Sequence, residues 1–294
     1  MSFSTFVIDV NRLLDQSISD ADFLVVDVET TGLSADDGDR VCEVGAVKLR
    51  GGAVVETFGT LINPQRPISA GAYAVNKISP QMVAEAPTFG ETAARLSDMM
   101  DDAVLVAYNA PFDLSFFSYE FRMAGFPPIR NPVVDALALA RQLLPGLQRY
   151  PQDNVANVIG IPFPVKHRAS DDALVTSQIF SIFVNMLKAY DVVLVNDLLR
   201  RDLSMDLHNK RMQLVGSAMS TGSRLWIKYL SPSNAEITER FVTPKQLARE
   251  VSAGFRQGPR RAGGPEVVYL IAHCHSVEAE RTFRIDRILD MKLA

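Results

Sequence analysis

The sequence predicts an α/β protein in which a mixed β-sheet flanked by helices is followed by a small β domain. Strand-like segments come first, at 23–29 and in a hairpin over 41–62. Helical and strand-like segments then alternate between residues 79 and 188, which is typical of a sheet covered by helices. Beyond residue 219 the pattern returns to short strands, which indicates a second domain of another class.

The first expected strand, 23–29, has strict alternation, so Asp27 and Glu29 lie on one face at its C-terminal end. Two neighbouring carboxylates repel each other, which makes the pair costly unless a cation is present. The next two segments, 41–49 and 53–62, are separated by an Arg-Gly-Gly sequence. Glycines between two strand-like segments predict a hairpin.

Helix boundaries in the middle of the chain follow from capping and breaking residues. Asn109 is the expected N-cap of a helix that has Pro111 in its first turn. Pro145 and Gly146 end a later helix. The expected elements are helices over 79–85, 88–101, 109 onward, 136 to about 144 and 170–188, with strands over 104–107 and 131–135.

The last third of the chain is expected to begin with helix. Residues 191–219 form a connector and the first helix of the second domain, and 256–264 is a loop because it is rich in Gly and Pro. The expected strands are 225–230, 239–242, 267–273 and 282–288.

Composition fits an ordinary globular protein of two domains, with 294 residues, 47% of them hydrophobic and 22% charged. The apolar runs are far shorter than the roughly 20 residues of a membrane helix. The N-terminal residues also lack the pattern of a signal peptide. Cys42 and Cys274 are too few for a disulfide framework or a thiolate metal cluster. We therefore expect a cytoplasmic protein with no membrane partner.

Charge is divided unevenly along the chain. Residues 1–200 carry 15 Lys/Arg against 24 Asp/Glu, a net charge of −9, whereas residues 201–294 carry 15 against 10, a net charge of +5. An acidic half that recruits divalent cations and a basic half that attracts phosphate would give this division. Solvated surface charge is the ordinary explanation for most individual residues.

Four carboxylates stand where they can meet. Asp27 and Glu29 end the first strand, and the other two, Asp113 and Asp172, come early in their helices. Together they can hold two Mg²⁺ or Mn²⁺ ions, which prefer oxygen ligands. Two ions roughly 3.5–4 Å apart can activate a water and steady the leaving 3′ oxygen. His167 can accept the proton of that water.

Taken singly, these residues have simpler explanations, since an Asp at a helix start is usually a cap and a loop histidine is usually solvated. The order of these residues along the chain, together with the residues that surround each of them, is more specific than any one of them alone. Residues 25–32 (Val-Val-Asp-Val-Glu-Thr-Thr-Gly), 106–113 (Val-Ala-Tyr-Asn-Ala-Pro-Phe-Asp) and 167–173 (His-Arg-Ala-Ser-Asp-Asp-Ala) resemble the three motifs of the DEDDh exonuclease family. This family includes the epsilon proofreading subunit of bacterial DNA polymerase III.

The resemblance covers about residues 20–188 and implies a ribonuclease-H-like fold with two-metal 3′→5′ hydrolysis. It implies metal ligands at Asp27, Glu29, Asp113 and Asp172, with His167 as general base. The implied substrate-binding residues are Thr30, Thr31, Gly32 and Leu33, which would meet the terminal nucleotide through backbone groups and apolar packing, together with Asn109 and Phe112.

Four further residues belong to the same comparison. Glu43 matches a family position that supports the sheet, and Asp135 is expected to be a structural polar residue at a strand end. Tyr108 and Asn76 depart from the family pattern, in which histidine is common at or near both places. Neither replaces a ligand, so catalysis is still expected, with an effect on substrate preference.

The segments 225–230, 240–244, 268–273 and 281–288 resemble a WYL domain, which covers about 213–294. Val268 replaces the tryptophan of the naming tripeptide. The resemblance implies a small Sm-like or SH3-like β-barrel that binds nucleic acid or a nucleotide ligand and regulates a fused enzyme. The expected domains are therefore 1–190, a helical connector over 191–212, and 213–294.

Arginines are the expected ligand-binding residues of that second domain. Arg240, Arg281 and Arg287 are the candidates, because guanidinium offers forked donors to phosphate, and solvated arginines are the equal alternative. If 282–288 is one strand, Arg281 and Arg287 point one way and Arg284 the other. His273 and His275 alternate around Cys274, but a metal site is disfavoured without a further ligand.

The leading hypothesis is a metal-dependent 3′→5′ exonuclease that releases nucleoside 5′-monophosphates. Its partners are DNA or RNA 3′ ends, because the motifs act on the phosphodiester that both share, and a homo-oligomer is left open. The alternative is a ligand-responsive nucleic-acid-binding regulatory protein without turnover. A direct transcription regulator would need a helix-turn-helix, for which the sequence offers no convincing candidate.

Overall fold

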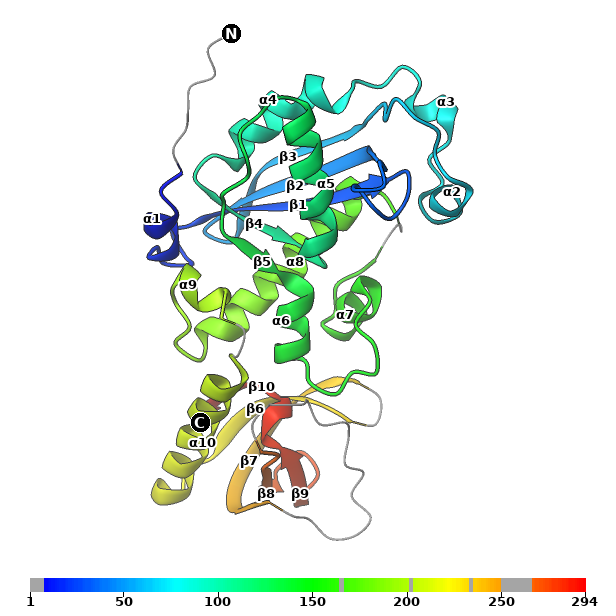
Figure 1. Ribbon diagram of the computed structural model, residues 1–294. Coiled ribbons are helices and arrows are strands. Elements are labelled where there is room, and N and C mark those ends of the chain that lie inside the picture. The colour runs from blue at the N-terminus through cyan, green and yellow to red at the C-terminus, as the bar shows by residue number, and fades with distance from the viewer. Residues whose placement is uncertain (1–7, 164–166, 201–202, 233–234, 250–265) are drawn as a thin grey trace. The chain divides into compact units, whose positions relative to one another are not determined.

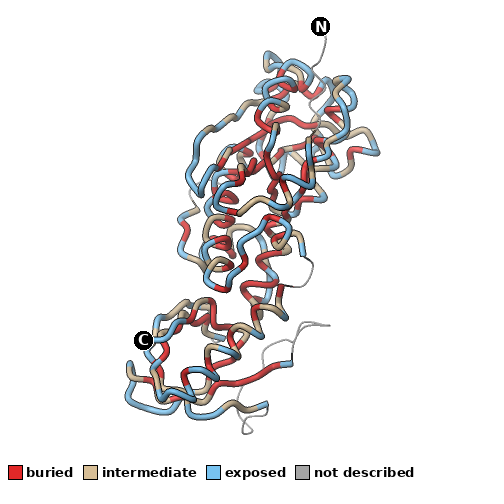
Figure 2. The backbone as a smooth tube through the Cα atoms, turned by 90° about the vertical axis from the view of Figure 1, so that its left-hand side faces the viewer, coloured by how far each residue is buried: buried red, intermediate tan, exposed pale blue. Residues whose placement is uncertain are grey.

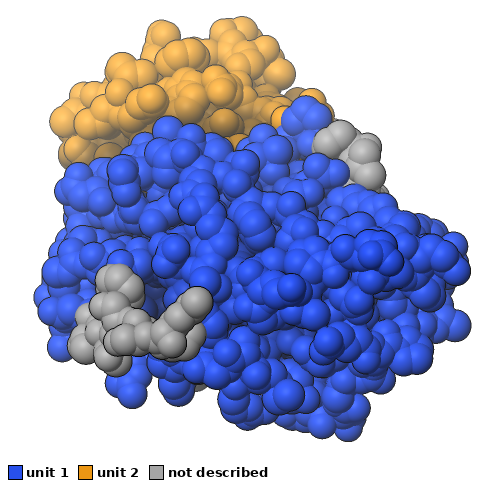
Figure 3. Space-filling view, turned by 90° about the horizontal axis from the view of Figure 1, so that it is seen from above, with its two compact units in different colours: residues 1–138, 161–181, 193–199 blue, residues 139–160, 182–192, 200–294 orange. Residues whose placement is uncertain are grey.

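The computed structural model describes residues 8–163, 167–200, 203–232, 235–249 and 266–294. The chain divides into two compact units (Figure 3). Unit 1 comprises residues 1–138, 161–181 and 193–199, and unit 2 comprises 139–160, 182–192 and 200–294. Two segments that precede residue 193 thus belong to the same compact unit as the C-terminal part of the chain.

Unit 1 contains the expected mixed sheet, in the order β3-β2-β1-β4-β5 (Figure 1). β1 pairs with β2 and β2 with β3 in antiparallel fashion, while β1–β4 and β4–β5 are parallel. Gly51 and Gly52 close the β2–β3 hairpin with φ values of 58° and 82°, which a type I′ turn requires. The strands are β1 (Asp22–Thr30), β2 (Val41–Arg50), β3 (Ala53–Leu61), β4 (Ala103–Ala107) and β5 (Val133–Asp135).

Helices fill the connections, as the alternation of patterns predicts. The expected helix over 79–85 is only one turn, α3, and three other helices, α1, α2 and α7, lie where the sequence pattern gave no helix. The helices up to residue 199 are α1 (Val10–Leu14), α2 (Ala70–Asn76), α3 (Pro80–Val83), α4 (Phe89–Met100), α5 (Ala110–Met123), α6 (Ala136–Leu143), α7 (Gln152–Val158), α8 (Ala169–Lys188) and α9 (Val195–Leu198).

The two faces of β1 pack against different helices. Leu24, Val26 and Val28 join a core with phenylalanines of α4 and α5. On the other face, the ring of Phe23 packs on Phe180 of α8, with ring centroids 4.8 Å apart. Figure 2 marks the buried residues in red. Because side chains alternate along a strand, Asp27 and Glu29 share the face of Phe23, toward α8.

Unit 2 contains an antiparallel sheet in the order β10-β6-β7-β8-β9, which fits the expected small β domain. Val215 and Ala218 of α10 (Ser204–Thr221) pack with the apolar face of this sheet. No pairing that would close the sheet into a barrel, between β9 and β10, occurs in the part of the chain that the structure describes. The strands are β6 (Leu225–Leu230), β7 (Ile237–Ala248), β8 (Tyr269–Cys274), β9 (Ala279–Arg284) and β10 (Ile288–Leu293).

The prediction of one strand over 282–288 is wrong. β9 ends at Arg284, and a 3₁₀ turn, η1 (Ile285–Arg287), separates it from β10. The buried residues explain the break, since Ile285 and Ile288 are three positions apart instead of two. Among the described helices of both units, none is long and apolar enough to cross a lipid bilayer. The expected loop 256–264 lies outside the described residues.

Candidate active site

The carboxyl ends of β1 and β4 lie side by side in the sheet, and the candidate site is built there. β1 carries Asp27 and Glu29, both only partly exposed. After β4 the chain passes through Asn109, whose φ of 69° lies in the left-handed region that asparagine tolerates. Helix α5 begins at the next residue, with Pro111 in its first turn. This tight connection places the first turn of α5 over the end of β1.

Asp113 is fixed by that first turn of α5. Its side chain is 3% exposed, and its Oδ1 accepts the backbone N–H of Val28 at 3.1 Å. Val28 lies between Asp27 and Glu29 in β1. The bond therefore ties the third carboxylate directly to the strand that carries the first two.

Asp172 is fixed by the way α8 begins. A Cβ on Gly45, which stands opposite Asp27 in β2, would lie 2.0 Å from the carbonyl oxygen of Ala169. The helix start thus rests directly on the backbone of β2. Glu43 accepts the backbone N–H of Ala169 at 3.3 Å, so Glu43 anchors α8 as well as belonging to the sheet.

Three candidate residues from β1 and α8 share one small volume. One donor atom each of Glu29, His167 and Asp172 lie within 4.8 Å of one another. His167 is exposed and has a φ of 63°, and Asp172 is 7% exposed. The structure therefore brings the histidine to the carboxylates, as the sequence predicts.

The electrostatics show that all four acidic side chains share this space. Although Asp27 keeps some exposed area, burial raises its pKa well above the ordinary value, and nearby carboxylates raise it further in the order Asp113, Asp172, Glu29 and Glu43. Burial is also the main cause that raises the pKa of Glu29 to about 7, of Asp113 to about 8 and of Asp172 to about 6. Like charges that are close together in a dry environment favour protonation.

This donor set fits divalent metal ions. Carboxylate oxygens are the preferred ligands of Mg²⁺ and Mn²⁺, and a cation would offset the repulsion that raises these pKa values. The residues that could hold such ions are Asp27, Glu29, Asp113 and Asp172.

The last residue of β1, Thr30, and the loop that follows it carry the four residues expected to meet a terminal nucleotide. Leu33 is 86% exposed, which is unusual for a large apolar side chain. The Thr30 hydroxyl donates to the carbonyl oxygen of Gly32 at 2.6 Å, and the Thr31 hydroxyl donates to Asp39 at 3.1 Å. Both threonine hydroxyls thus shape the loop, while Leu33 faces outward.

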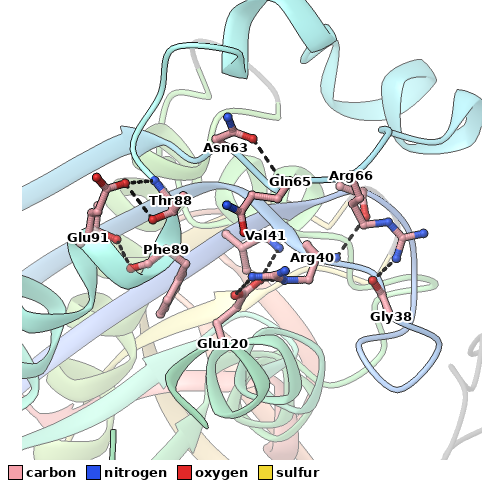
Figure 4. A network of polar contacts seen from close by, with 12 residues as sticks. Gly38, Arg40, Val41, Asn63, Gln65, Arg66, Thr88, Phe89, Glu91 and Glu120 are labelled. Atoms are coloured by element: carbon pink, nitrogen blue, oxygen red, sulfur yellow. Dashed lines mark hydrogen bonds and ion pairs between the residues drawn. The ribbon is translucent and has the colours of Figure 1, made fainter. Parts of the chain in front are cut away.

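An ion pair that the sequence did not predict holds this loop against α5 (Figure 4). Glu120 is 1% exposed and accepts both Nε and Nη2 of Arg40, at 2.8 and 2.7 Å. It also accepts the backbone N–H of Val41 at 3.0 Å. Such a forked pair fixes direction as well as distance.

The polar residues around β4 and β5 act mainly on the backbone. Asn109 occupies the N-cap position of α5 as expected, but its side chain makes no capping hydrogen bond. Asp135 accepts the backbone N–H groups of Asn109 and Leu137, at 3.1 and 3.0 Å, in keeping with a structural role. Phe112 is half-buried and packs on Phe116, with ring centroids 5.1 Å apart.

Asn76 forms hydrogen bonds at the site that the sequence did not predict. Its side chain is 3% exposed, and its Nδ2 donates to the carbonyl oxygen of Thr30 at 3.2 Å. A hydrogen bond from Asn76 to Glu29 also lowers the pKa of that carboxyl, against the larger effect of burial. The only sequence signal for this role was its departure from the family pattern.

The three arginines predicted to bind a ligand in the second domain differ in accessibility. Arg281 is exposed, and Arg240 is half-buried, with its Nη1 donating to Cys274 Sγ at 3.8 Å. Arg287 is 2% exposed because it lies in the 3₁₀ turn, where its Nη2 donates to the carbonyl oxygen of Gly146 at 3.5 Å. Arg287 is therefore not part of an exposed patch, which corrects that prediction.

Comparisons with known proteins bear on both parts of the chain. A family model described as exonuclease matches residues 24–180, and a model of the WYL domain matches residues 265–293. The chain is 37% identical over 164 residues to the DNA polymerase III subunit epsilon of Treponema pallidum, covering 55% of this chain and 76% of that protein.

A longer relative is the PolC-type DNA polymerase III of Caldanaerobacter subterraneus subsp. tengcongensis, which is 31% identical over 266 residues. That match covers 89% of this chain but 19% of the polymerase, so the chain spans less than a fifth of this relative. Among solved structures, E. coli exonuclease I in complex with a dA16 oligonucleotide has a TM-score of 0.50 at 15% identity, covering 93% of this chain and 63% of that one. At this identity the likeness concerns the fold alone.

The exonuclease model spans more than half of the chain, and the match to the epsilon subunit covers 76% of that protein. The chain therefore belongs to the DnaQ-like exonuclease family, and it carries a WYL domain at residues 265–293.

Proposed function

We propose that the protein is a 3′→5′ exonuclease that uses two Mg²⁺ or Mn²⁺ ions to hydrolyse the terminal phosphodiester of DNA or RNA and release nucleoside 5′-monophosphates. The main support is the convergence of four carboxylates from three elements, β1, α5 and α8, at the end of the central strand. The observation that carries the proposal is that Asp113 bonds to the backbone of Val28, between Asp27 and Glu29, while Glu29 and Asp172 have ligand atoms within 4.8 Å of one another.

In this proposal Asp27, Glu29, Asp113 and Asp172 hold the ions. When bound, the ions supply positive charge that favours ionisation of the attacking water and stabilises the leaving 3′ oxygen. The fixed backbone contacts of Asp113 and of the start of α8 keep the ligands in position before the ions arrive. Preorganised ligands of this kind do not have to be rearranged during the reaction.

His167 is the proposed general base. It is exposed, so substrate and water can reach it, and it lies in the same small volume as Glu29 and Asp172. A neutral imidazole has a ring nitrogen that can accept the proton of the attacking water.

The loop after β1 is the proposed binding site for the terminal nucleotide. The outward-facing Leu33 offers an apolar surface for a base or sugar, and Gly32 leaves room for the backbone to approach the substrate. A Cβ on Gly32 would lie 2.2 Å from Oδ2 of Asp39, so a larger residue would displace the carboxylate that accepts the Thr31 hydroxyl and the backbone N–H of Ser34. Asn109 and Phe112 remain proposed contacts on the α5 side.

We further propose that the WYL domain binds nucleic acid or a nucleotide and regulates the nuclease. The net charge of +5 over residues 201–294 and the accessible Arg281, with Arg240, support this. Both cysteines are buried free thiols, which fits the cytoplasmic location that we propose.

The test uses the full chain with Mg²⁺ and oligonucleotides labelled at the 5′ or the 3′ end. Asp27→Asn and Asp172→Asn should abolish hydrolysis, because each removes a proposed metal ligand. Asp171→Asn is the matched control, since it removes the neighbouring carboxylate in the same helical turn. Turnover at the wild-type rate in either of the first two variants would contradict the metal assignment.

Two further measurements separate the proposed roles. His167→Ala should lower the rate by about 100-fold or more while Mg²⁺ binding is retained, because a general base is lost but no metal ligand. A panel of single- and double-stranded DNA and RNA should show mononucleotide release from the 3′ end. Binding without any release would favour the regulatory protein without turnover.

A further inference from the structure

A second group of metal-ligating side chains lies in unit 2, at the hairpin between β8 and β9. His273 is in β8, His275 follows it, and Glu278 stands in the turn with a φ of 48°. Cys274 between the two histidines is buried. Because neighbouring side chains of a strand alternate, both imidazoles point away from the core, and both are partly exposed.

The turn supplies the third ligand that the sequence pattern lacked. One ring nitrogen of each histidine and one carboxylate oxygen of Glu278 lie within 4.8 Å of one another. Nε2 of His273 is 3.2 Å from Oε2 of Glu278. A tetrahedral ion with ligands at about 2.0–2.2 Å holds its donor atoms about 3.4 Å apart, so this pair is already near the required spacing.

The surroundings hold the group in place. The Thr243 hydroxyl of β7 contacts Nε2 of His275 at 2.9 Å, and the two imidazole rings stand edge to face with centroids 4.8 Å apart. Hydrogen bonds to a ligating imidazole orient it in known metal sites. Glu278 is exposed, so its carboxylate can rotate to complete the group.

We propose that His273, His275 and Glu278 form a binding site for a divalent transition metal ion such as Zn²⁺. Two imidazoles with one carboxylate suit Zn²⁺, Co²⁺, Ni²⁺ or Cu²⁺, whereas the all-carboxylate set on β1, α5 and α8 suits Mg²⁺ or Mn²⁺. Three protein ligands leave a further position for water or an exogenous ligand. The two sites belong to different compact units and differ in ligand chemistry, so this inference does not depend on the nuclease being active.

The direct test is nuclear magnetic resonance of the ¹⁵N-histidine-labelled full chain, titrated with ZnCl₂ in a large excess of Mg²⁺. The sequence contains four histidines, so each imidazole can be assigned by a single substitution. The proposal expects the rings of His273 and His275 to shift together, with saturation at one Zn²⁺, while His208 is unaffected. Shifts confined to His167, or none at all, would overturn it.

Equilibrium dialysis with Zn²⁺ supplies the variant test under the same excess of Mg²⁺. His275→Ala and Glu278→Gln should each lower the affinity by at least tenfold, because each removes one of three ligands. Glu280→Gln is the matched control: it removes a carboxylate of the same hairpin, which stands opposite His273 and pairs with Lys245. An unchanged Zn²⁺ affinity in His275→Ala and Glu278→Gln would show that these side chains make only an ordinary histidine–glutamate contact. An equal loss of affinity in Glu280→Gln would show that Zn²⁺ responds to the overall charge of the hairpin. Either result would overturn the proposal. Glu278 is exposed, so its substitution does not threaten the fold.

Discussion

Replacing Gly45 by alanine tests whether the contact between β2 and α8 positions Asp172. The added Cβ would lie 2.0 Å from the carbonyl oxygen of Ala169 and 2.5 Å from the backbone nitrogen of Ser170. An ordinary carbon–oxygen contact is about 3.5 Å, so the start of α8 must recede by about 1.5 Å. Backbone atoms cannot rotate away as a flexible side chain can, so the whole first turn of the helix has to move.

The expected cost follows from this displacement. Overpacking of this kind destabilises a fold by about 1–3 kcal/mol. A misplacement of about 1 Å in a catalytic group can lower the rate by about 100-fold, and Asp172 lies in the turn that moves. We therefore expect Gly45→Ala to lower kcat with Mg²⁺ by about that factor and to raise the Mg²⁺ concentration needed for half-maximal rate.

The assay pairs mononucleotide release with urea unfolding. Gly71→Ala is the control, because a Cβ there meets only Ser69 Oγ at 3.9 Å and alanine favours helix α2. Parental kcat together with parental unfolding free energy in Gly45→Ala would refute the reasoning. A loss of stability with full activity would show that Asp172 tolerates the displacement.

Three other predictions concern charge. The raised pKa values of Glu29, about 7, and Asp113, about 8, mean that the metal-free fold binds protons that the unfolded chain has released. The contribution of these two groups to the unfolding free energy should therefore be fully present below their ordinary pKa values and be lost as the pH rises through about 7 and about 8, and thermal unfolding should show that Mg²⁺ restores most of this loss at pH 8. Asp27→Asn should raise the melting temperature of the metal-free protein at pH 8, because it replaces a carboxyl group whose ionisation is disfavoured by burial and by neighbouring carboxylates with an amide that cannot ionise; calorimetry that shows a lower temperature would indicate a structural role. Glu120→Gln should cost about 3 kcal/mol in urea unfolding, since it leaves the charge of Arg40 without its buried partner; an unchanged midpoint would contradict this.

Local patterns predicted the elements that carry the site. The alternation in β1 placed Asp27 and Glu29 on one face, and the packing of Phe23 on Phe180 shows that this face meets α8. The capping residue Asn109 located the start of α5, and the expected helix over 170–188 begins one residue after α8 does. Such patterns depend on neighbours in the sequence, which is why they can be read without the fold.

The contacts that hold the site together could not be predicted in this way. Glu120 meets Arg40 80 residues away, and Glu43 anchors the helix that begins 126 residues later. Asn76 is the last residue of helix α2, and the sequence of α2 has no apolar period strong enough to predict that helix. These contacts depend on which elements pack together, and the sequence of a single chain does not encode that in any local pattern.

The expected strand over 282–288 failed for a related reason. Alternation predicts a strand only while the buried positions keep a spacing of two, and here the spacing becomes three after Ile285. The buried Arg287 follows from this turn, because a regular strand would have placed it on the same side as the exposed Arg281. The charged Arg287 between the apolar Ile285 and Ile288 was therefore the sequence signal that the strand was interrupted.

The fixed backbone contacts explain why the candidate site should depend on a cation. Asp113 is bonded to the backbone of β1, and the turn that carries Asp172 rests on Gly45, so neither carboxylate can withdraw without breaking the packing of its helix. The repulsion among the acidic groups can then be relieved only by protons or by positive ions. Below about pH 6 protons are available, since burial raises the pKa of Asp172 to about 6 and that of Glu29 to about 7. As the pH rises through about 8, Glu29, Asp113 and Asp172 lose their protons, and divalent cations can then neutralise these carboxylates without deforming the site.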